Sequence, residues 1–73
     1  MNTFQRLCRI LEEEFQIEAA EITMETTFSE MGLGSLETVD AVMRIEEEFH
    51  VEISDEDMEK FHCIADVCGY LEK

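Results

Sequence analysis

The chain has 73 residues, of which 45% are hydrophobic, and its 19 acidic and five basic residues give a formal charge of −14 at pH 7. This length predicts one domain, residues 1–73, with little room for an enclosed active site, so that a carrier or binding role is favoured over catalysis. The acidic excess argues against nucleic acid as a partner and favours basic protein partners. We expect a monomer. We also expect no insertion into membranes, because no stretch approaches the roughly 20 apolar residues of a membrane span.

The first predicted element is a helix that ends near Phe15. Asn2 or Thr3 is suited to cap it, and Gln5 follows Asn2 at the spacing of a capping box. Apolar side chains then recur at helical intervals, which indicates one core-facing side: Phe4, Leu7, Cys8, Ile10, Leu11 and Phe15.

A long connection is predicted next, because no helical stripe persists after Ile17 and three threonines interrupt the pattern. A connection of about 18 residues exceeds the usual loop length and should be held by apolar anchors of its own. The candidates are Ile17, Ala20, Ile22, Phe28, Met31 and Leu33. Residues 28–31 are expected to form a short helical turn.

The central helix is predicted from Ser35 to Phe49, after a sharp turn for which Gly32 and Gly34 supply backbone freedom. One side of this helix is a core-facing stripe made of Thr38, Ala41, Val42, Ile45 and Phe49. A second apolar stripe on another side is flanked by acids: Leu36, Val39 and Met43 with Glu37, Asp40 and Glu47. Two readings stay open, a surface for a partner or a helix that the domain buries on both sides.

Two shorter helices complete the chain. Ser54 is expected to cap the first, with three acids in its opening turn. The second begins near Cys63 and places Ile64, Val67, Cys68 and Leu71 on one side. The predicted fold class is therefore all-α, a four-helix bundle with a long loop between helices 1 and 2 and a short third helix.

No catalytic or metal-binding constellation is found in the sequence. Cys8, Cys63 and Cys68 are odd in number and lack CxxC spacing, so we expect reduced thiols and no metal site. His50 and His62 stand apart without the partners of a catalytic base, and surface or helix-end positions are expected for both. With no export signal visible, the expected location is the cytoplasm.

The order of elements and the central segment together resemble the acyl carrier protein family. The most specific stretch is FSEMGLGSLETVDAVMRIEEEFHVEIS, residues 28–54, which is similar to the family's glycine and serine turn followed by an acidic helix. The resemblance implies an acyl-carrier fold in which Ser35 carries a covalent 4′-phosphopantetheine arm, whose terminal thiol holds acyl groups as thioesters. The first turn of a helix is a favourable place for the phosphate of such an arm.

The resemblance also implies partners. These are a phosphopantetheinyl transferase and acyl-transfer or synthase enzymes of lipid or polyketide biosynthesis, with basic patches that meet the acidic face of the central helix. The implied contact residues are Leu36, Glu37, Val39, Asp40, Met43 and Glu47. The implied shelter for an acyl chain is formed by Phe28, Ala41, Val42, Ile45 and Ile64.

One position departs from the family pattern, since Gly34 stands where the family has aspartate directly before the serine. That aspartate lies near the metal and the phosphate donor during attachment. Three readings follow: a specialised carrier whose transferase accepts glycine, a carrier-like adaptor that stays unmodified, or an engineered change at this position. A D-alanyl or aminoacyl carrier shares the same outline, and an acidic binder of divalent cations is a further alternative.

Overall fold

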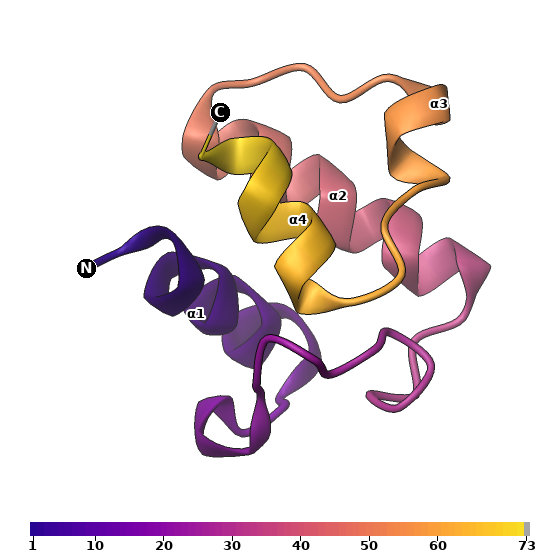
Figure 1. Cartoon of the computed structure of the whole chain (residues 1–73). Coiled ribbons are helices and arrows are strands. Elements are labelled where there is room, and N and C mark those ends of the chain that lie inside the picture. Colours follow the sequence, from indigo (N-terminus) through magenta and orange to yellow (C-terminus); the bar gives the residue numbers. More distant parts are fainter. Residues whose placement is uncertain (73) are drawn as a thin grey trace.

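The computed structural model describes residues 1–72, which contain four α-helices and one 3₁₀ helix. In chain order these are α1 (Thr3–Phe15), η1 (Ala19–Glu21), α2 (Ser35–Phe49), α3 (Asp55–Met58) and α4 (Ile64–Leu71). Helix α1 packs against both α2 and α4 (Figure 1). The predicted all-α fold, with a long connection after the first helix and a short third helix, is confirmed.

The helix ends follow the local sequence. The side chain of Asn2 accepts a hydrogen bond from the backbone N–H of Gln5, and the side chain of Gln5 accepts one from Asn2 in return, so the capping box of α1 is formed. The side chain of Ser54 caps α3 with a single hydrogen bond, which its hydroxyl oxygen accepts from the backbone N–H of Asp57. Helices α1 and α2 both end at a residue in the left-handed region, Gln16 and His50 respectively.

A single core lies between α1, α2 and α4. It contains the predicted apolar side chains of α1 and the core-facing stripe of α2. In that stripe Ala41, Val42 and Ile45 are buried, and Thr38 and Phe49 are half-buried. The other buried side chains come from the connection, from the segment after α3 and from α4: Ile22, Phe28, Leu33, Phe61, Ile64, Val67 and Cys68.

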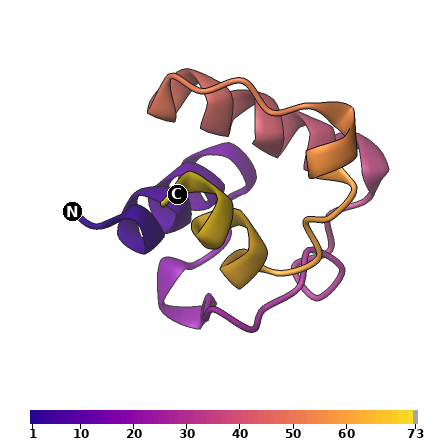
Figure 2. The same cartoon turned by 45° about the horizontal axis from the view of Figure 1, so that its top comes forward.

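The long connection is attached to the segment between α3 and α4 by backbone hydrogen bonds. Thr27 and Cys63 form an isolated antiparallel bridge. Beside it the N–H of Ile64 donates to Thr26 O at 3.0 Å, and that of Ala65 donates to Met24 O at 2.8 Å. Figures 1 and 2 show the connection along one side of the molecule, while the link from α2 to α3 crosses the opposite side.

One expectation for the connection is wrong in detail. Ala20 is exposed, and the anchor is instead Ala19, which packs against the core and donates its N–H to Glu12 Oε2 at 3.2 Å. The cause is the unpredicted 3₁₀ turn η1, which directs its first alanine inward. The short helical turn expected over residues 28–31 is present, since the Met31 N–H donates to Thr27 O at 3.3 Å and the Gly32 N–H to Ser29 O at 2.9 Å. Gly32 at φ +78° ends it.

The role expected for Gly34 is also corrected. Its φ of −83° and ψ of −171° describe an extended conformation that any residue adopts, so only Gly32 is needed for the turn. The missing side chain at position 34 instead leaves the N-terminus of α2 without a side-chain cap.

Candidate functional site at the start of helix α2

Ser35 is the first residue of α2 and is exposed to solvent. The Gly34 carbonyl fixes this turn, since it accepts from the Thr38 N–H at 2.9 Å and from the Thr38 hydroxyl at 2.8 Å. The serine hydroxyl therefore lies at a defined place on the surface, where a second group can reach it.

The first turn of α2 lacks the cap that α1 and α3 have. Within residues 1–72, no side chain accepts a hydrogen bond from its N–H groups in the N-cap manner, because position 34 is glycine. The carboxylate of Glu37 accepts instead from the Gly34 N–H, at 2.8 Å. Free N–H groups at the positive end of a helix dipole attract phosphate, so this turn suits a phosphorylated group on Ser35.

A groove of about 440 Å³ opens beside Ser35. Its walls come from three parts of the chain: the end of the connection, the first turn of α2, and α3 with the residues after it. The lining residues are Phe28, Ser29, Leu33, Gly34, Ser35, Thr38, Val39, Met58, Glu59, Phe61 and His62. Sequence reasoning did not connect the last four with Ser35, because a backbone bridge between distant segments brings them there.

The second stripe of α2 faces solvent. Leu36 is 77% exposed, Met43 56% and Val39 38%. Their acidic neighbours Glu37, Asp40 and Glu47 are exposed too. Of the two readings of this stripe, burial on both sides is therefore wrong, and an apolar strip between carboxylates remains open for contact.

The residues expected to shelter an acyl chain lie inside the bundle. Ala41, Ile45 and Ile64 are fully buried, and Val42 and Phe28 are nearly so. Phe28 also lines the groove beside Ser35, so this side chain separates the groove from the core.

The three thiols are unpaired. Cys8 and Cys68 are buried, and burial raises the pKa of both. The negative charge of Glu12 raises the pKa of Cys8 further, and Glu72 and Cys8 do the same for Cys68. Cys63 is half-buried at the N-cap of α4. The expectation that the three cysteines are buried or half-buried is confirmed.

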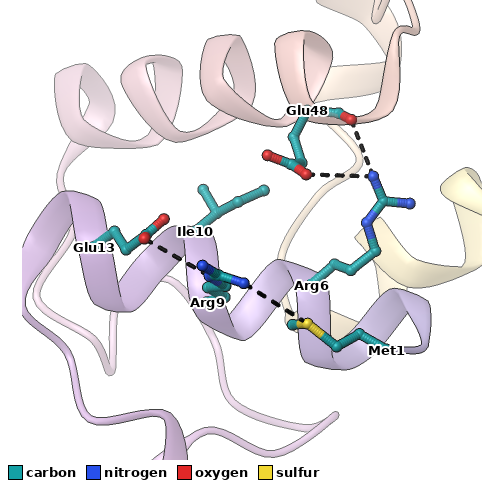
Figure 3. A pocket seen from close by; sticks show the side chains of 6 residues that line it. All are labelled: Met1, Arg6, Arg9, Ile10, Glu13 and Glu48. Carbon is teal, nitrogen blue, oxygen red and sulfur yellow. Dashed lines mark hydrogen bonds and ion pairs between the residues drawn. The ribbon is translucent and has the colours of Figure 1, made fainter.

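Another cleft, of about 390 Å³, lies at the far end of α2 and is held together by ion pairs (Figure 3). Arg6 donates to the backbone oxygen of Glu48 at 3.0 Å and stacks over Phe49. Arg9 pairs with Glu13 at 3.7 Å. Because Arg6 on α1 contacts Glu48 on α2, this cleft lies at the junction of the two helices.

In residues 1–72 no helix is long and apolar enough to cross a membrane. The same part of the chain holds no cluster of three or more His, Cys, Asp or Glu side chains with the geometry of a metal site.

Fold and site together define a small helical carrier domain with an exposed serine at the start of its second helix. Residues 5–71 match the family model described as the phosphopantetheine attachment site. The chain therefore belongs to this family, which includes the acyl carrier proteins, and its cofactor is covalent 4′-phosphopantetheine. As a carrier domain it interacts with a transferase and with enzymes that handle its thioesters.

Proposed function

We propose that this protein carries acyl intermediates as thioesters on a 4′-phosphopantetheine arm attached to the hydroxyl of Ser35. The observation that carries the proposal is the exposed serine at an uncapped helix start, within a chain that matches the attachment-site family over residues 5–71. The arm supplies a thiol for the thioester bond. The residues of the chain hold its phosphate at the positive end of α2 and leave the rest of the arm free to reach other proteins.

The proposed docking surface is the exposed face of α2, formed by Leu36, Glu37, Val39, Asp40, Met43 and Glu47. Exposed carboxylates around an apolar strip complement an enzyme surface on which lysines and arginines surround an apolar pocket. The charges would speed the encounter, and the apolar side chains would supply most of the contact energy. Such transient contact suits a carrier that visits several enzymes in turn.

We further propose that the acyl chain is sheltered among Phe28, Ala41, Val42, Ile45 and Ile64. Support comes from Phe28, which belongs both to the groove beside Ser35 and to the core. A chain that starts on Ser35 enters the apolar interior when this ring moves aside. Burial of the methylene groups then favours the sheltered state by about 0.8 kcal/mol for each group.

The proposed setting is lipid or polyketide biosynthesis in the cytoplasm, with the protein as a delivery module that is not itself an enzyme. Three unpaired cysteines agree with a reducing compartment. The mass of the group on protein isolated from its host tests the cargo. A fatty or polyketide acyl group supports the proposal, whereas D-alanine or another amino acid would assign the protein to aminoacyl carriers.

Attachment is tested by mass spectrometry after incubation with coenzyme A and a broad-specificity phosphopantetheinyl transferase. Wild-type protein should gain the mass of one phosphopantetheinyl group, and Ser35→Ala should gain none. Ser29→Ala is the matched control, because Ser29 is exposed and lines the same groove, and this variant should be modified like wild type. No gain by wild type, or equal gain by Ser35→Ala, would show that Ser35 is not the attachment residue.

Charge reversal tests the docking surface, and Ser35→Ala in the same binding assay separates the carrier from an unmodified adaptor. The double variant Asp40→Lys with Glu47→Lys should weaken binding to an acyl-handling enzyme roughly tenfold or more, which corresponds to at least about 1.4 kcal/mol. The control makes the same charge change on exposed acids outside α2, Glu18→Lys with Glu21→Lys, and should bind almost normally. Enzyme binding that needs neither Ser35 nor an attached arm would favour the adaptor.

A further inference from the structure

His62 and Ser35 line the same groove although 27 positions separate them in the sequence. Ser35 belongs to the α2 wall, and His62 lies on another wall, in the segment that joins α3 to α4. The groove is open to solvent and has a volume of about 440 Å³, so a group attached to Ser35 starts in the same groove that His62 lines.

The backbone on either side of the His62 side chain is held in place. Its N–H donates to Asp66 Oδ2 at 3.0 Å, and its carbonyl accepts from the Phe28 N–H at 3.3 Å. These bonds do not use the imidazole, and His62 is an exposed residue. The position of His62 is therefore fixed by the fold, while its side chain is replaceable without loss of a structural hydrogen bond.

Among the described residues that line this groove, His62 is the only one whose side chain can carry a positive charge. Four charged groups lie near His62 in the chain or on the elements around the groove. They are Glu59, which lines the groove, Lys60 two positions earlier, Asp66 on α4, and Glu37 in the first turn of α2. Carboxylates ordinarily titrate near pH 4, and lysine ordinarily stays charged up to about pH 10, so histidine alone changes the local charge in that interval.

We propose that His62 positions the base of the arm, its protonated imidazole facing the phosphodiester on Ser35 across the groove. The inference rests on the proposed attachment at Ser35 and adds a second contact for the phosphate, besides the first turn of α2. Protonation of His62 draws the start of the arm toward α3. Deprotonation releases it, and the arm is then held by the helix end alone.

The test is ³¹P NMR of the modified protein across pH 5 to 8. A phosphodiester keeps one negative charge over this interval, so its resonance moves only when a neighbouring group titrates. We expect the wild-type resonance to shift within this interval. In His62→Gln this movement should disappear, and in His62→Lys the resonance should stay constant because the charge is fixed.

His50 supplies the internal control. It is exposed like His62 but caps the other end of α2, roughly 22 Å from Ser35 at 1.5 Å per helical residue. His50→Gln should therefore show the wild-type movement. About 1 M salt, which reduces the Debye length to about 3 Å, should diminish the movement in wild type.

The outcomes separate the two proposals. If wild type gains no phosphopantetheinyl mass, both fail. If the mass is gained but the ³¹P resonance is independent of pH, or moves as much in His62→Gln as in wild type, attachment at Ser35 stands and the role of His62 is refuted.

Discussion

The carboxylate of Glu37 accepts a hydrogen bond from the backbone N–H of Gly34, with 2.8 Å between Gly34 N and Glu37 Oε1. This bond forms half of a capping box, and the other half is missing because glycine offers no side-chain acceptor. The departure from the family at position 34 therefore has a local structural consequence. It exchanges a side-chain cap in front of the serine for an open turn.

Gly34→Asp is predicted to raise the rate of phosphopantetheine attachment. The backbone at position 34 accepts any residue, and a Cβ there would lie 2.9 Å from Glu37 Oε1, at the tip of a flexible exposed side chain that can move aside. Aspartate then places a carboxylate directly before Ser35, where the resemblance to acyl carrier proteins implies a role near the transferase metal. The measurement is kcat/KM for the transferase.

Gly34→Asn is the matched control for that prediction. Asparagine caps a helix about as well as aspartate, and either should stabilise α2 over glycine by only a few tenths of a kcal/mol. Asparagine carries no charge, so it should not speed attachment. Equal gains from both variants would show that the cap matters and the charge does not.

Leu36→Ala and Met43→Ala are predicted to weaken enzyme binding without destabilising the fold. Both side chains are more than half exposed, so their removal should change the free energy of unfolding by no more than about 0.5 kcal/mol. Ile45→Ala on the same helix is the contrast, because Ile45 is fully buried and its truncation should cost about 2–5 kcal/mol. Urea unfolding and transferase kinetics on each variant measure the two effects. A loss of stability in Leu36→Ala comparable to that in Ile45→Ala would contradict the assignment of the exposed face.

Alkylation by iodoacetamide should distinguish the three cysteines. The thiolate is the reactive form, and burial raises the pKa of Cys8 and Cys68 and also blocks access to them. Half-buried Cys63 should react first in native protein at about pH 8, and all three should react alike in denaturant. Peptide mass mapping over time gives the rates. Modification of Cys8 at the rate of Cys63 would mean that α1 does not seal this side of the core.

The pH dependence of stability should include a contribution from Asp66. Its carboxylate accepts hydrogen bonds from the backbone N–H groups of His62, at 3.0 Å, and Cys63, at 3.2 Å, and these bonds lower its pKa. A lowered folded pKa means that the stabilisation is present above the unfolded value, near 3.8, and is lost as pH falls through the folded value.

Asp66→Asn tests this contribution. At neutral pH its urea midpoint should lie below that of wild type. The gap should close as pH falls below 3.8 and through the lowered pKa of folded Asp66, where this aspartate becomes neutral as well. A gap that stays constant down to acid pH would show that the charge of Asp66 contributes nothing to the cap of α4.

The local sequence determined most of the secondary structure. The capping box of Asn2, the cap at Ser54 and the apolar spacing of α1 and α2 act through neighbours within one helical turn, so they can be read from a single sequence. The same holds for Ser35 at the start of α2. Exceptions such as η1 and the extended backbone of Gly34 are also local, but several backbone conformations fit the residues there, and packing selects among them.

The tertiary structure alone decided what surrounds Ser35. Spacing along α2 placed Leu36, Val39 and Met43 on a second side, yet whether that side is buried depends on where α3 and the connection run. Backbone pairing of residues 24–28 with residues 62–65 places His62 on the groove that Ser35 also lines. Hydrogen bonds between backbone groups are nearly independent of side-chain identity, so no pattern in the sequence specifies which distant segments will pair.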